Sequence, residues 1–119
     1  AGLSDTWQGR QDMGVVAGRS DAPRIVLTHN PETVFDLPDE AEVDLLVAGH
    51  THGGQIYIPG LTCALAPMAC AVTRYGAFDH EKAKVFVTSG TGMVGLPMRF
   101  LAPPRIDVLN VHYKSCASG

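Results

Sequence analysis

The chain has 119 residues, of which 45% are hydrophobic and 18% are charged, and its formal net charge is −3. This length and composition are those of one modest globular domain, and they exclude a disordered chain. The nine lysines and arginines are scattered along the sequence, so no basic patch for a nucleic acid is expected.

The first half of the chain alternates short apolar runs with turn signals. Such runs predict buried strands, whereas Pro31 suits the first turn of a helix that Pro38 then ends. The pattern predicts one or two helical turns over 12–18, a strand over 24–28, a short helix over 31–37 and a strand over 43–48. The first ten residues are expected to form a loop anchored by Trp7.

The second half is expected to be richer in strands. The sequence predicts strands over 55–58, 71–75, 84–88 and 105–112, with a turn around Gly76 and Asp79. Residues 61–69 give no clear signal, and the small polar residues of 114–119 are expected to fray. Low helix content with five or six short strands is therefore predicted.

The most specific motif is Gly49-His50-Thr51-His52-Gly53-Gly54-Gln55, which follows the strand predicted over 43–48. Glycines on both sides allow a tight turn and the close approach of another group to the backbone. Neutral imidazole is the commonest metal ligand in proteins. The motif therefore predicts that His50 and His52 bind metal.

A third histidine, His29, ends the strand predicted over 24–28, and Pro31 keeps Asn30 in an extended or turn conformation. Strand ends of this kind meet at the carboxyl edge of an α/β sheet when the strands are parallel. If segment 31–42 allows parallel pairing, His29 and His50 are expected to be neighbours.

Two further features are candidate phosphate contacts. Ser89-Gly90-Thr91-Gly92 is a poor phosphate-binding loop, because neither a helix nor a Lys-Ser/Thr pair follows it, and a loop whose backbone lines a site is more plausible. Arg99 is either a contact to phosphate oxygens or a structural ion pair. Neither Ser-His-Asp nor Cys-His catalysis is indicated.

No Asp, Glu, Lys or Arg occurs from Leu45 to Thr73, which predicts either a buried strand with a packed loop or an apolar wall facing a greasy substrate or a membrane. The three cysteines have no Cys-x-x-Cys spacing. Reduced thiols in a cytosol-like compartment are therefore expected, with a Cys63–Cys70 bridge as the alternative.

Together, the segments Thr28-His29-Asn30-Pro31, Gly49–Gln55 and Gly95-Leu96-Pro97-Met98-Arg99-Phe100 with Pro103-Pro104 resemble the C-terminal half of a calcineurin-like metallophosphoesterase. The closest likeness is to a bacterial phosphodiesterase branch whose members often lie at or near the membrane. Gly2–Asp5 and Trp7 resemble the segment that precedes the first of these motifs in that branch.

The resemblance implies an α/β fold, a two-sheet sandwich flanked by helices, of which residues 1–119 form the strand-rich C-terminal part. It implies that His29 and His50 bind one metal ion and that His52 binds a second. The family's Asp-x-His, Gly-Asp-x-x-Asp and Gly-Asn-His blocks do not occur in this chain, so the other ligands are expected from an N-terminal half that precedes Ala1.

The implied activity is hydrolysis of a phosphodiester or phosphomonoester by a metal-activated water, with Mn, Fe or Zn as the two divalent ions. The alternative is a non-catalytic truncated fragment that binds at most one metal and needs its N-terminal half or self-association. A structural zinc module is disfavoured because no fourth ligand has a suitable spacing. A location in the cytoplasm or at the periphery of the membrane is expected, with membrane contact possible through 45–73.

Overall fold

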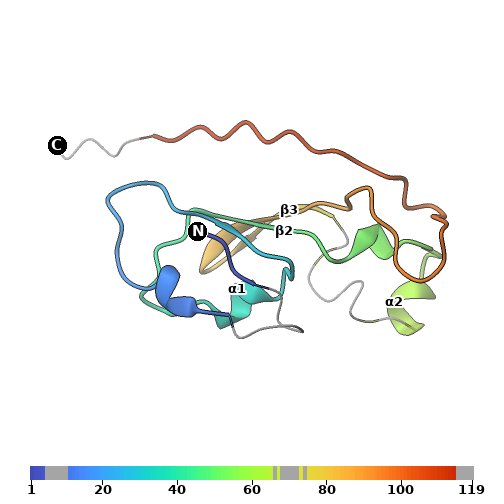
Figure 1. Ribbon diagram of the computed structural model, residues 1–119, viewed down its shortest axis with the longest axis horizontal. Helices are drawn as coiled ribbons and strands as arrows, with labels where there is room; N and C mark the ends of the chain where they lie inside the picture. The colour runs from blue at the N-terminus through green and yellow to red at the C-terminus, as the bar shows by residue number, and fades with distance from the viewer. Residues whose placement is uncertain (5–10, 66, 68–72, 74, 115–119) are drawn as a thin grey trace.

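The computed structural model describes residues 1–4, 11–65, 67, 73 and 75–114 (Figure 1). These residues include one four-stranded sheet. The strands are β1 (Ile25–Leu27), β2 (Leu45–Ala48), β3 (Gly76–His80) and β4 (Ala83–Val87), in the order β1-β2-β4-β3. β1, β2 and β4 are parallel neighbours, and β3 is antiparallel to β4. This mixed sheet confirms the predicted α/β, strand-rich class.

The helical elements are short. They are the 3-10 turn η1 (Met13–Val15), helix α1 (Thr33–Asp36), the 3-10 turn η2 (His52–Gly54) and helix α2 (Thr62–Leu65). The positions of η1 and α1 confirm the helical turns predicted over 12–18 and 31–37. Because α1 connects β1 to β2, these two strands run in the same direction and end at the same edge of the sheet.

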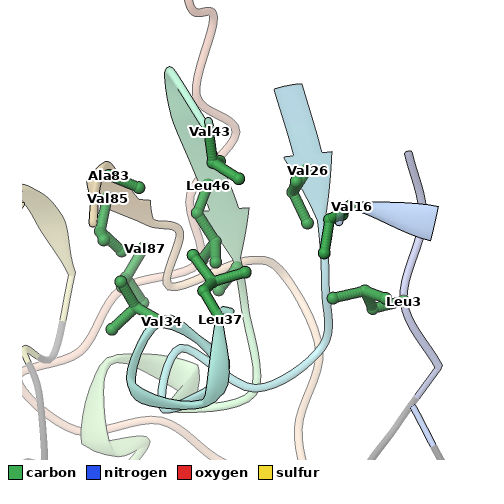
Figure 2. Packing of buried hydrophobic residues seen from close by; sticks show 11 residues of the cluster. Leu3, Val16, Val26, Val34, Leu37, Val43, Leu46, Ala83, Val85 and Val87 are labelled. Atoms are coloured by element: carbon green, nitrogen blue, oxygen red, sulfur yellow. The ribbon is translucent and has the colours of Figure 1, made fainter. Parts of the chain in front are cut away.

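The hydrophobic core lies on the face of the sheet that η1 and α1 cover (Figure 2). Strand residues pointing to this face alternate with residues pointing to the other, as the two-residue period of a strand requires. The fully buried side chains of this core include Val26, Leu46, Val85 and Val87 from the strands and Val34 from α1.

The opposite face of the sheet is only partly covered. A cavity of about 710 Å³ lies between this face, with Ile25, Leu45 and Phe86 in its wall, and the C-terminal segment 108–114. That segment runs extended across the molecule (Figure 1). Large apolar residues of this segment remain exposed, with Val108 83% accessible, and so does the preceding Ile106, which is 84% accessible.

Three predicted elements differ from the structure. The strand predicted over 105–112 is wrong, because the segment is extended but pairs with no strand of the described sheet. In place of the strand predicted over 55–58, Ile56 forms an isolated bridge with Phe100. The turn expected around Gly76 and Asp79 is instead strand β3, and the chain reverses at Glu81 and Lys82.

Other predictions fall partly on residues outside those described, including the loop at Trp7, the strand over 71–75 and the tail after Lys114. The expectation of reduced thiols is wrong for Cys63, which is disulfide-bonded, and Cys70 and Cys116 also lie outside the described residues. Among the described residues, no helix has the length and apolar character needed to cross a membrane.

Candidate metal site

The ends of β1 and β2 bring His29 and His50 together. Leu27 pairs with Val47 in the parallel register, and two residues further on the amide of Gly49 donates to the carbonyl of His29 over 3.1 Å. The rings then meet at an angle of 67°, with 2.8 Å between His50 Nδ1 and His29 Nε2. The parallel pairing on which the sequence argument depended is therefore present.

The loop after β2 has an unusual backbone. His50 has a φ of 64°, His52 a φ of 49° and Gly53 a φ of 64°, all in the left-handed region. Residues other than glycine adopt this backbone region at a cost in conformational energy, and residues in such conformations are concentrated at functional sites. The side chain of Thr51 accepts a hydrogen bond from the Gly53 amide and helps to hold the turn. The sequence motif did not reveal this conformation.

His52 has a defined tautomer. Its Nδ1 lies 3.1 Å from the carbonyl oxygen of Gly92, and a carbonyl accepts but cannot donate, so Nδ1 carries the hydrogen. The lone pair of the neutral ring is then on Nε2. Histidine ligands in metal sites commonly donate their other ring N–H to a backbone carbonyl in this way.

His29 and His50 therefore form a pair, and His52 lies apart with its own partner, Gly92. Among the described residues, no group of three His, Cys, Asp or Glu side chains is arranged to hold an ion. Nitrogens of His29 and His50 converge, however, and an ion about 2.1 Å from each nitrogen at a right angle needs them roughly 3 Å apart. The pair therefore fits one metal ion when the shared hydrogen is lost and both rings turn a nitrogen lone pair toward the ion, and other ligands must complete the coordination.

Arg99 lies beside His52 and donates to four backbone carbonyls of the described residues. Its Nη1 donates to Gly92 over 2.6 Å, its Nη2 to His52 over 2.6 Å and to Ser89 over 3.2 Å, and its Nε to Ala102. The predicted loop 89–92 thus lines the site through its carbonyl oxygens. These bonds account for four of the five N–H groups of the guanidinium.

Two polar residues were missed by the sequence analysis. The side-chain amide of Gln55 donates to Val94 and Leu96 over 2.9 Å each and accepts from the Val94 amide over 2.7 Å. Both carboxylate oxygens of Glu32 are buried, and no described residue hydrogen-bonds to them. A buried carboxylate is costly unless it is paired.

Exposed apolar residues follow Gly92, whose carbonyl contacts His52, along the chain. Gln55 ties the loop 93–96 to the chain after η2, and the amide of Tyr57 donates to the carbonyl of Phe100 over 2.8 Å. We call the exposed apolar residues of the segments 58–65 and 93–98 the apolar rim. They are Ile58, Leu61, Leu65, Met93, Val94, Leu96 and Met98. No Asp, Glu, Lys or Arg occurs in the stretches 45–73 and 85–98 that carry it.

The chain is similar to several bacterial proteins. It is 36% identical over 99 residues to an uncharacterised metallophosphoesterase of Helicobacter pylori, covering 82% of this chain and 26% of that protein. It is 35% identical over 113 residues to the uncharacterised metallophosphoesterase YkuE of Bacillus subtilis, covering 93% of this chain and 39% of that protein. It is 31% identical over 110 residues to the phosphodiesterase YaeI of Escherichia coli, covering 92% of this chain and 40% of that protein.

The chain thus spans between about a quarter and two fifths of the length of these relatives. No family model matches the sequence, and no solved structure matches it.

Proposed function

Because this chain belongs to the calcineurin-like metallophosphoesterase family, we propose that it supplies the C-terminal metal-binding histidines of a metal-dependent phosphodiesterase. The observation that carries the proposal is the 2.8 Å approach of His50 Nδ1 to His29 Nε2 at the carboxyl edge of the sheet. A phosphodiester is the substrate class we favour, because one similar protein is named a phosphodiesterase.

In this proposal His29 and His50 hold one divalent ion and His52 Nε2 holds a second. The chain's own contribution is to fix these rings: the β1–β2 register orients His29 and His50, and the Gly92 carbonyl orients His52. When bound, such ions activate a water and stabilise charge on the phosphate during in-line attack. Mn, Fe or Zn suits a site with nitrogen and oxygen ligands.

The remaining ligands come, in this proposal, from an N-terminal half of the same domain outside the 119 residues. Two observations support such a partner: the incomplete coordination among the described residues and the partly covered sheet face. We propose that the N-terminal half covers the face that contains Ile25, Leu45 and Phe86. Without it, the exposed apolar face favours self-association.

The number of bound ions tests this proposal directly. The 119-residue chain, loaded with Mn²⁺ or Zn²⁺ and desalted, is expected to retain one ion or none, because His29 and His50 alone provide converging ligands. The longer protein that contains it is expected to retain two. Elemental analysis gives metal equivalents per chain in both cases, and hydrolysis of bis(p-nitrophenyl) phosphate is measured on the same samples.

Two tightly held ions on the 119-residue chain, together with hydrolysis, would show that it needs no N-terminal half. If the longer protein holds fewer than two ions and hydrolyses neither a diester nor a monoester, the proposed function is wrong. The chain would then be the non-catalytic, metal-poor fragment that the sequence analysis gave as the alternative.

We also propose that the apolar rim lies against a membrane surface, so that the protein is peripheral to the membrane. Leu65 is 76% exposed and Val94 is 69% exposed, although both lie in stretches without charged residues. Burying a side chain of this size from water contributes about 1.5–3 kcal/mol. Since Gly92 contacts His52 and directly precedes Met93 of the rim, this proposal brings His52 near the lipid headgroups.

Binding to vesicles is the corresponding measurement. Cosedimentation of the longer protein with neutral phosphatidylcholine vesicles is expected to fall at least about tenfold in the Leu65→Asp, Val94→Asp double variant. Each change removes an apolar side chain that the proposal buries in the lipid. Ile106→Asp is the matched control, because Ile106 is 84% exposed but lies outside the rim. Equal binding by all three proteins, or binding by none, would exclude the rim as a membrane contact.

A further inference from the structure

Arg99 contacts His52, one of the predicted metal histidines, through its side chain. Its guanidinium binds the carbonyls of Gly92, His52, Ser89 and Ala102, which belong to three separate turns of the chain. A guanidinium used in this way has one N–H group left for a ligand, whereas bidentate recognition of phosphate needs two. The geometry therefore disfavours a phosphate clamp.

The carbonyl of Gly92 connects Arg99 to His52. It accepts from Arg99 Nη1 over 2.6 Å and from His52 Nδ1 over 3.1 Å, so the guanidinium fixes the acceptor that sets the tautomer of the ring. Arg99 Nη2 also donates to the backbone carbonyl of His52 itself, over 2.6 Å. The same side chain thus holds both the backbone of His52 and the partner of its ring.

Packing around these groups is close. A Cβ atom added to Gly92 would lie 3.1 Å from Cε1 of His52 and 3.5 Å from its Nδ1. A Cβ atom added to Gly53 would lie 3.0 Å from the Cβ of Ser89 and 3.7 Å from Nη2 of Arg99. The His52 ring therefore lies directly against the Gly92 backbone, on the side where the Gly92 carbonyl contacts its Nδ1.

We propose that Arg99 is a positioning residue for metal binding: by holding the Gly92 carbonyl and the His52 backbone, it keeps His52 in the tautomer that presents Nε2 to an ion. This inference rests on the proposed function for its biological meaning, but the position and tautomer of His52 are measurable without catalysis. Residues that orient a metal ligand typically change metal affinity 10- to 100-fold when they are removed.

The first test uses the metal-free 119-residue chain. Long-range ¹⁵N–¹H spectra are expected to show His52 with the hydrogen on Nδ1, and Arg99→Ala is expected to lose that single tautomer. Arg19→Ala is the matched control, because the Arg19 side chain is 89% exposed and pairs with Glu42 at the surface. An unchanged His52 signal in Arg99→Ala would overturn the proposal.

The second test uses the longer protein, with Zn²⁺ titration and the kinetics of bis(p-nitrophenyl) phosphate hydrolysis. Arg99→Ala is expected to lower the affinity of one Zn²⁺ about 10- to 100-fold, while KM at saturating Zn²⁺ changes less than about twofold. Arg99→Lys keeps the charge but lacks the fork that reaches several carbonyls, so it is expected to restore little Zn²⁺ affinity. A rise in KM with unchanged Zn²⁺ affinity, reversed by Arg99→Lys, would instead identify a phosphate contact.

Gly92→Ala keeps the test decisive if Arg99→Ala does not fold. The added methyl presses on the His52 ring while Arg99 is intact, so Zn²⁺ affinity is expected to fall with little change in KM. Gly2→Ala is its control, because a Cβ there meets nothing within 4 Å. Unchanged affinity in Gly92→Ala would contradict the proposal. If the unmutated protein hydrolyses no phosphoester, only the proposed function fails, because the tautomer and Zn²⁺ affinity still report on Arg99.

Discussion

Replacing His50 by alanine in the longer protein is expected to lower hydrolysis of bis(p-nitrophenyl) phosphate by at least about a hundredfold. The reason is that, in the proposed site, His50 and His29 bind the same ion through nitrogens 2.8 Å apart, so that removing either ring leaves that ion without a converging pair. Loss of a group that only orients a ligand already costs 10- to 100-fold in affinity or activity, and loss of the ligand itself costs at least as much.

His52→Ala is expected to reduce activity to a similar extent by a separate route. His52 turns away to the Gly92 carbonyl, and it forms no three-residue cluster with His29 and His50 among the described residues. Each single variant is therefore expected to lose one of two metal equivalents, and the double variant both. Metal content by elemental analysis and initial rates, measured on the same preparations, separate the two positions.

His112→Ala is the matched control for this pair. His112 lies in the exposed C-terminal segment beyond the sheet, so its loss is expected to change neither metal content nor rate. If His50→Ala and His52→Ala both hydrolyse the diester as fast as the unmutated protein, the three histidines are not the metal ligands. The family resemblance would then have led to the wrong residues.

The strands that carry the site were predictable because their sequences have strong local signals. β1, β2 and β4 are short segments rich in Val, Leu, Ile and Phe, and turn residues follow them closely. The sequence also placed His29 and His50 just after the ends of their predicted strands, so that parallel pairing was sufficient to join them. Periodicity and strand ends are local properties, and local properties can be identified in a single sequence.

The elements that were wrong depend on partners distant in the sequence. β3 includes Gly76 and Asp79, which have poor strand propensity, but Asp79 pairs with Lys84 on β4 and forms an ion pair of 2.8 Å with it. Conversely, the segment over 105–112 has good strand residues but no neighbour to pair with in the described sheet. Strand formation needs a partner strand as well as a favourable sequence.

The finer features of the site were not predictable for a different reason. The left-handed backbone at His50 and His52 and the tautomer of His52 are set by the close packing of loops 49–55 and 89–102. The role of Arg99 depends on this packing, because one of its carbonyl partners, His52, lies 47 residues away in the sequence. No pattern in one sequence encodes which carbonyls a guanidinium will reach.

Leu46→Ala is expected to lower the stability of the 119-residue chain by about 2–5 kcal/mol, because the side chain is 0% exposed in the central strand β2 and its loss leaves a cavity. For a domain of this size the change corresponds to a fall in Tm of roughly 10–20 °C. Thermal unfolding followed by circular dichroism measures it. An effect below about 1 kcal/mol would mean that the core of Figure 2 is not formed in solution.

Leu45→Ala is the informative comparison, because Leu45 is the neighbouring leucine on β2 but points to the half-open face beside the 710 Å³ cavity. In the 119-residue chain its loss is expected to cost less than that of Leu46, since less surface is buried. In the longer protein the two costs are expected to become similar, because an N-terminal half that covers this face would bury Leu45 as fully as the core buries Leu46. A cost for Leu45→Ala that is the same in both proteins would mean that the face stays open, and the remaining metal ligands would then have to approach the histidines from the edge of the sheet alone.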